Sequence, residues 1–99
     1  MKSGLDSKEI IRRIETRRNE IRKLGIRKLG LFGSYLKGTQ KRGSDVDLLV
    51  EFDEVTWNGY FDALDLMKKI FQRKIDLVIE KSLKPELDYV KEEAIYVKI

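Results

Sequence analysis

Two small residues and two carboxylates at fixed spacing form the part of this sequence best suited to chemistry. Gly33-Ser34 is followed, after ten residues, by Asp45-Val46-Asp47 and an apolar run. Because side chains alternate across a strand, Asp45 and Asp47 are expected to point the same way, about 6.6 Å apart. Such a pair can bind two metal ions of the kind used in phosphoryl transfer, which lie roughly 3.5 to 4 Å apart. The alternative is a polar strand end that faces water.

A third carboxylate would complete the metal site, and two acidic residues are candidates. Glu51 shares the predicted face but lies about 13 Å beyond Asp47 along the strand, too far to share a metal with ligand distances of about 2.1 Å. Asp76 is favoured, because it interrupts an apolar strand where a charge is costly unless it is paired or bound to metal. The alternative for Asp76 is a strand-edge charge that faces solvent. The chain has no His and no Cys, so ligation by oxygen favours Mg²⁺ and leaves Mn²⁺ open.

The Gly33-Ser34 pair lies where a strand is expected to pass into a helix. Glycine lets a ligand approach the backbone closely, and free N–H groups at a helix N-terminus attract phosphate. The Ser34 hydroxyl can add a hydrogen bond, although serine there is equally an ordinary N-cap. Lys37, Lys41 and Arg42 could neutralise phosphate charge, and a solvated basic loop is the alternative for them.

Alternating helix and strand signals predict the elements that position these residues. Helices are expected over residues 7–24, 34–39 and 60–71, with a last helix opened by Pro85. Strands are expected over residues 26–32, 45–52, 74–79 and 95–99. Asp6 and Glu9 resemble a capping box at the first helix. The pattern predicts an α/β fold with a small mixed sheet flanked by helices, as one domain over residues 1–99.

Composition limits the remaining choices. A chain of 99 residues buries only about 60 to 65% of its unfolded surface, and without cysteine it has no disulfide. No signal peptide or membrane span is visible, so we expect a cytoplasmic protein. The basic face between Arg12 and Lys28 is interrupted by acids. We favour a solvated, salt-bridged face there and expect no direct nucleic-acid binding. Trp57, Tyr60 and Phe61 could touch a base or a partner, and we favour core packing or a hydrophobic staple for them.

Together these residues resemble a known family. Gly-Ser, ten residues, Asp-x-Asp and an apolar strand form the signature of the DNA polymerase β-like nucleotidyltransferase superfamily. The surrounding residues are most similar to its minimal nucleotidyltransferase branch, and so is the closing stretch 91–97. Asp76 matches the third carboxylate of that family. The resemblance covers nearly the whole chain and implies the polymerase β-like nucleotidyltransferase fold.

The resemblance also implies a role for each residue. Gly33 and Ser34 would hold the triphosphate of ATP or another nucleoside triphosphate. Asp45, Asp47 and Asp76 would be catalytic and would bind metal, with two Mg²⁺ ions expected. Asp76 would also help to deprotonate an acceptor hydroxyl, which attacks the α-phosphate and releases pyrophosphate. Positioning and charge neutralisation would supply most of the catalysis.

The resemblance finally implies a partner, because larger relatives carry a helical acceptor-binding domain for which this chain has no room. The implied partner is a HEPN-domain toxin, and the small protein acts as its antitoxin by transferring AMP to a tyrosine. The alternative is a catalytically weak or inactive module that neutralises a HEPN-type partner by stoichiometric binding. Three converging carboxylates argue against a pure binder. A small-molecule acceptor and a homo-oligomer stay open.

Overall fold

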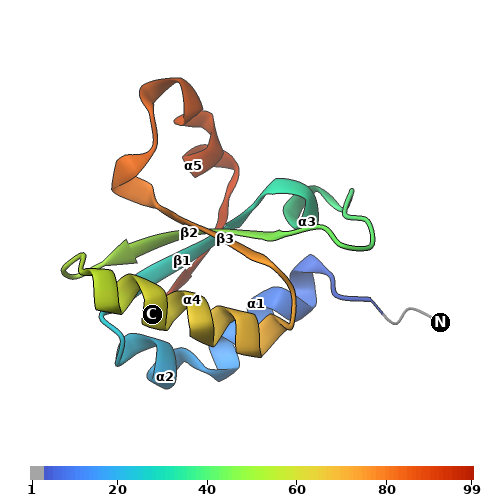
Figure 1. The fold of residues 1–99 in the computed structure, drawn as a ribbon. Helices are drawn as coiled ribbons and strands as arrows, with labels where there is room; N and C mark the ends of the chain where they lie inside the picture. The colour runs from blue at the N-terminus through green and yellow to red at the C-terminus, as the bar shows by residue number, and fades with distance from the viewer. Residues whose placement is uncertain (1–3) are drawn as a thin grey trace.

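The structure, a computed structural model, describes residues 4–99 and contains a four-stranded mixed sheet (Figure 1). In the order β3-β2-β1-β4, its strands are β3 (Ile75–Ile79), β2 (Val46–Phe52), β1 (Ile26–Phe32) and β4 (Ile95–Lys98). β1 runs antiparallel to β2 and β4, whereas β2 and β3 are parallel. The predicted α/β class and mixed sheet are confirmed, with strand bounds within one residue. Residues 1–3, part of the predicted domain, lie outside the described residues.

The helices are divided between the two sides of the sheet. Figure 1 shows α1 (Ser7–Thr16), α2 (Arg18–Arg22) and α4 (Trp57–Phe71) below it. The short helix α3 (Gly33–Lys37) follows β1 directly. Above the sheet lie α5 (Tyr89–Glu93) and two 3₁₀ turns, η1 (Glu80–Ser82) and η2 (Pro85–Leu87). Within residues 4–99, no helix is both long and apolar enough to cross a bilayer.

The core lies between the sheet and α1, α2 and α4. Val46, Leu48 and Val50 of β2 are fully buried on this face, as the alternation of the strand predicts. The helices add their own buried apolar side chains, which are Ile10, Ile14, Ile21, Ala63, Leu66, Met67, Ile70 and Phe71. Among the described residues, no charged side chain is buried. The core therefore occupies one face of the sheet, and polar groups collect on the other.

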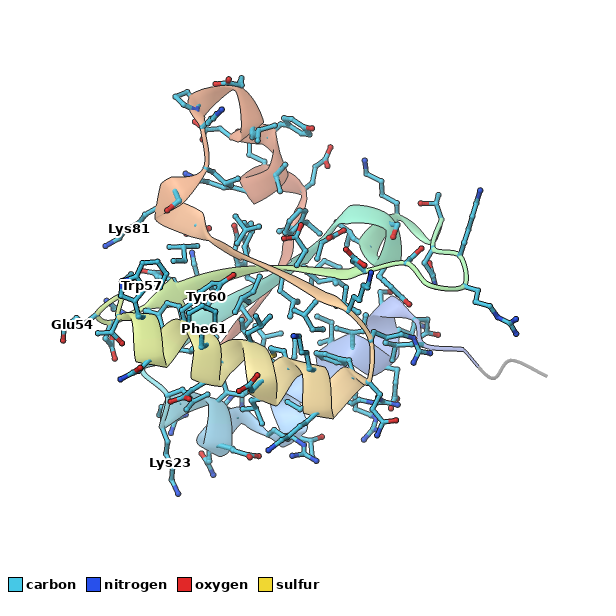
Figure 2. All side chains as sticks on the ribbon, viewed as in Figure 1. Lys23, Glu54, Trp57, Tyr60, Phe61 and Lys81 are labelled. Carbon is cyan, nitrogen blue, oxygen red and sulfur yellow. The ribbon has the colours of Figure 1, made fainter. Side chains whose placement is uncertain are left out.

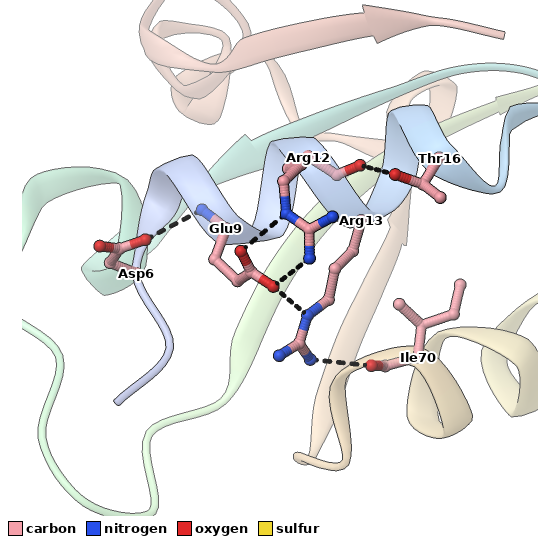
Figure 3. A network of polar contacts seen from close by, with 6 residues as sticks. All are labelled: Asp6, Glu9, Arg12, Arg13, Thr16 and Ile70. Atoms are coloured by element: carbon pink, nitrogen blue, oxygen red, sulfur yellow. Dashed lines mark hydrogen bonds and ion pairs between the residues drawn. The ribbon is translucent and has the colours of Figure 1, made fainter. Parts of the chain in front are cut away.

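A polar network fixes the start of α1 and joins it to α4 (Figure 3). The Asp6 side chain accepts a hydrogen bond from the Glu9 N–H at 2.9 Å, which confirms the predicted N-cap. Glu9 does not complete the capping box, because its carboxylate pairs with Arg12 at 2.6 Å and Arg13 at 2.8 Å. Hydrogen bonds from these two guanidinium groups lower the pKa of Glu9 to about 2. Arg13 also donates to the Ile70 carbonyl at 3.0 Å, near the end of α4.

The predicted first helix, residues 7–24, is broken in two. Arg17 leaves the helical conformation, with φ −105° and ψ 21°. The Thr16 hydroxyl donates to the Arg12 carbonyl at 2.7 Å, a side-chain bond that competes with the backbone ladder and bends helices. Beyond the break, Arg17 pairs with Glu20 at 3.2 Å, in keeping with the predicted salt-bridged face.

The helix predicted to begin at Pro85 is confirmed only as a short 3₁₀ turn. Pro85 begins the 3₁₀ turn η2, and α5 starts only at Tyr89. Neither η1, η2 nor α5 contributes a buried residue. Because short helices in proteins depend on tertiary packing of an apolar face, this segment has little to stabilise a longer helix.

On the face of the sheet away from the core, a polar cluster joins η1 to the strands. The Tyr96 hydroxyl donates to Glu80 at 2.6 Å, and the Lys28 ammonium lies 4.4 Å from the centre of the Tyr96 ring. Gly30 is opposite Tyr96 in the β1–β4 pairing. A Cβ at Gly30 would lie 2.7 Å from the ring, so only glycine lets the ring lie flat on β1.

Gly30→Ala is expected to lower the free energy of unfolding by about 1 to 3 kcal/mol, because the new methyl group overlaps the Tyr96 ring. Urea unfolding followed by circular dichroism measures this loss. Gly4→Ala is the control, since its Cβ would meet nothing within 4 Å. In a Tyr96→Ala background the loss should become smaller. An undiminished loss would show that the ring is not the cause.

Candidate active site

Strand pairing brings the predicted carboxylates together. Asp47 lies on β2 and Asp76 on β3, and the parallel register places them directly opposite each other. Neighbouring strands lie about 4.7 to 4.9 Å apart, so these two side chains are adjacent on the face away from the core. Asp45 lies immediately before β2 and its charge acts on Asp47. All three predicted acids therefore lie at one end of the β2–β3 pair.

Asp47 is the electrostatic centre of this group. Its pKa is raised from 3.8 to about 6, first by partial burial and then by the charges of Asp76 and Asp45. A hydrogen bond with the Asp76 carboxyl acts in the same direction, whereas one from the Ser34 backbone N–H opposes it. No cation of the described residues forms a salt bridge with Asp45, Asp47 or Asp76. The cluster thus concentrates negative charge that a bound cation would neutralise.

Gly33 and Ser34 lie against the same carboxylates. β1 ends at Phe32 and α3 begins at Gly33, which confirms the predicted strand-to-helix junction. Gly33 has a φ of +77°, a left-handed conformation that disfavours any side chain, and a Cβ there would collide with the Asp47 carboxylate. The backbone of this junction can therefore approach Asp47 only because residue 33 is glycine.

The donor set fits a hard divalent cation, because it consists of carboxylate oxygens alone. Across residues 4–99, however, no three acidic side chains already converge as a finished metal site. Asp45 and Asp76 are exposed, so their side chains have room to turn toward a cation. Glu51, which its spacing from Asp47 excluded as a ligand of the same metal, instead pairs with Lys28 at 3.7 Å. The structure thus places Asp47 at the centre, with two movable carboxylates beside it.

The basic residues of the motif lie on α3 and the following loop. Lys37, Lys41 and Arg42 are all exposed. Lys41 and Arg42 line a pocket of about 430 Å³ together with Arg73, a cation from the α4–β3 connection that the sequence analysis did not single out. The only signal for Arg73 was its position shortly before the strand that carries Asp76.

Two of the three aromatic residues after β2 differ from their predicted role, whereas Tyr60 packs against the core. Figure 2 shows Trp57, Tyr60 and Phe61 along one side of α4. Trp57 is 80% exposed and Phe61 52% exposed, so the prediction of core packing is wrong for both. Tyr60 is partly buried and donates to the Leu77 carbonyl at 2.6 Å. Its pKa is raised first by burial and then by the charge of Asp76.

In protein freed of metal by EDTA, Asp47→Asn is expected to raise the free energy of unfolding at pH 7.5 by about 1 to 2 kcal/mol, after discounting for solvent screening. Since the folded-state pKa of Asp47 is raised to about 6, its stabilising contribution is complete below about pH 4 and is lost as the pH rises through 6. The gain should therefore be small at pH 4. Urea unfolding at both pH values measures it, with Asp65→Asn, an exposed α4 carboxylate, as control. Equal effects at both pH values would contradict the raised pKa.

Comparison with known proteins identifies the family of this chain. The sequence pattern of the nucleotidyltransferase domain family matches residues 11–97. A protein of Methanocaldococcus jannaschii named as a candidate protein adenylyltransferase is 36% identical over 86 residues, covering 84% of this chain and 84% of its own.

Two solved structures have the same fold. A candidate minimal nucleotidyltransferase superposes with a TM-score of 0.80 and 29% identity, over 95% of this chain and 98% of its own. A chain from a toxin–antitoxin complex with AMP-PNP gives a TM-score of 0.62 and 26% identity, over 79% and 69%. The nucleotidyltransferase match spans nearly the whole chain and includes the Gly-Ser turn and all three aspartates. This protein therefore belongs to the nucleotidyltransferase domain family, and its fold is similar to that of a minimal nucleotidyltransferase.

Proposed function

We propose that this chain is a metal-dependent protein adenylyltransferase that transfers AMP from ATP to a hydroxyl of a partner protein, with residues 1–99 acting as one domain. The observation that carries the proposal is the in-register pairing of Asp47 with Asp76, with Asp45 and the Gly33 turn beside it. Two observations support AMP as the transferred group. One relative is named as a candidate protein adenylyltransferase, and this chain shares its fold with a chain from a complex that contains AMP-PNP.

The three aspartates are the proposed metal ligands. Asp45, Asp47 and Asp76 would hold two Mg²⁺ ions, with Mn²⁺ as the second choice for an oxygen-only site. When bound, such ions neutralise phosphate charge and polarise the phosphoryl oxygens. The raised pKa of Asp47 supports this assignment, because it results first from partial burial and then from the uncompensated charges of Asp76 and Asp45.

The protein groups orient the nucleotide and the acceptor. The Gly33 backbone and the Ser34 hydroxyl are the proposed contacts to the triphosphate. The acceptor oxygen forms a bond to the α-phosphorus as the bond to the bridging oxygen breaks, and pyrophosphate leaves with that electron pair. Asp76 is exposed and can accept the hydroxyl proton. Holding the reactants in line supplies much of the rate.

The proposed acceptor is a HEPN-domain toxin, which the resemblance of the sequence implies. Within that pair this chain is the antitoxin, and the modification of a toxin hydroxyl is what neutralises the toxin. A fold shared with a chain of a toxin–antitoxin complex supports such a partnership. We place the pair in the cytoplasm, where ATP is available.

Co-expression with the protein encoded beside this chain is expected to add one or more AMP units to that protein, read as its intact mass. The Asp45→Asn/Asp47→Asn variant should reduce the rate of transfer by at least about 10²-fold, because the charges that bind metal are removed. Asp65→Asn, an exposed carboxylate on α4, is the matched control and should transfer AMP normally. Transfer at the normal rate by the double variant would refute the proposed site.

The second candidate function, stoichiometric neutralisation, predicts a different result from the same proteins. If the Asp45→Asn/Asp47→Asn variant binds the partner and still relieves its toxicity fully, binding alone is sufficient. If neither a complex nor a mass change is observed, a small-molecule acceptor becomes the better hypothesis.

A further inference from the structure

An apolar groove lies where the N-terminus of α4 meets the edge strand β3. Val55, Trp57 and Tyr60 line it from one side, Leu77 and Ile79 from the other, and its volume is about 380 Å³. β3 is an edge strand of the sheet formed by the described residues, and its Leu77 and Ile79 line one wall of this groove. Figure 2 shows Trp57, Tyr60 and Phe61 projecting at this end of α4.

The aromatic side chains beside the groove are ordered among themselves but lack a cover. Trp57 stacks on Phe61 with ring centres 6.1 Å apart, and Phe61 meets the edge of Tyr60 at 5.5 Å. Trp57 is nonetheless 80% exposed and Val55 49% exposed. Monomeric proteins rarely expose large contiguous clusters of apolar side chains, and such clusters usually mark interaction sites. Trp and Tyr are also the residues that most often dominate binding energy in protein interfaces.

Tyr60 connects the groove to β3, the strand that carries Asp76. Tyr60 lines the groove and donates to the Leu77 carbonyl at 2.6 Å. Leu77 follows Asp76 directly, and the charge of Asp76 acts on the Tyr60 phenol. A protein seated on Trp57 and Tyr60 would therefore also contact β3, the edge strand that carries Asp76 on its other face.

Charges at the rim identify the class of occupant. Glu54 and Lys81 adjoin the lining residues Val55 and Ser82, and Figure 2 shows both at this end of the molecule. Binding of a nucleic acid or of an anionic membrane surface is favoured by a rim that carries positive charges alone. An apolar centre with a rim of both signs is the anatomy of a protein interface.

We infer that this aromatic groove is the docking surface for the acceptor protein, binding an apolar segment of it next to the hydroxyl that receives AMP. The inference rests on the proposed function, in which a separate protein supplies the acceptor. It assigns recognition of that protein to Trp57, Phe61 and Val55, and chemistry to the aspartates on the neighbouring face of the sheet.

The test uses the full chain with the protein encoded beside it. Trp57→Ala/Phe61→Ala should weaken binding of that protein about 30-fold, the effect of removing one interface hot spot, and raise its KM similarly. The KM for ATP should stay unchanged, which a general loss of structure would not allow. Tyr89→Ala is the matched control, since Tyr89 is an aromatic residue with 53% exposure on α5, away from the groove.

Unchanged affinity and KM for the partner in Trp57→Ala/Phe61→Ala would overturn the docking surface. If wild-type AMP transfer persists in that case, the proposed function stands without it. If the wild type transfers no AMP but binds the partner, and the double variant does not bind it, the proposed transferase activity is refuted. The docking surface is then still supported. A wild-type dimer that dissociates in the variant, with partner affinity unchanged, would assign the groove to a second copy and also overturn the inference.

Discussion

The pairing register of β2 with β3 is the constraint on which the candidate site depends. In this register Leu48 is opposite Leu77 in the core, and Asp47 is consequently opposite Asp76 on the other face. Sliding one strand by a single residue would carry Asp76 into the core and expose Leu77, so burial of the apolar partners enforces proximity of the acids. The hydrophobic effect thereby holds two like charges together, and partial burial together with this neighbouring charge raises the pKa of Asp47.

The two faces of the sheet divide stability from chemistry. One face is covered by α1, α2 and α4 and carries nearly all the buried apolar surface. The other carries the aspartates and the cluster of Lys28, Glu80 and Tyr96, which ties η1 to the strands. Because the core does not need that second face, it can keep unpaired carboxylates that would be destabilising in the interior. Such an arrangement suits a site that gains its missing positive charge from a ligand.

Strand alternation and glycine positions made most of the sheet predictable from sequence, since both act over a few residues. The elements that were mispredicted depend on competing or distant contacts. At the break before α2, the Thr16 hydroxyl donates to the Arg12 carbonyl, a side-chain bond that bends helices. The expected helix at Pro85 lacks a buried face to stabilise it. Trp57 has the spacing of a core residue on an amphipathic helix, yet nothing within the described part of the chain covers it. The helical periodicity of apolar residues predicts that a helix has an apolar face, but it does not predict what packs against that face.

The sequence by itself determined the chemical types of the site: oxygen ligands, a glycine turn, and acids that alternate with apolar residues along a strand. Those properties are local, because backbone geometry and side-chain alternation set them. Tertiary structure decided that Asp76 lies opposite Asp47, that Gly33 packs against the Asp47 carboxylate, and that Tyr60 meets β3. These contacts join segments far apart in the chain, and they follow from how the whole core packs rather than from any single stretch of residues.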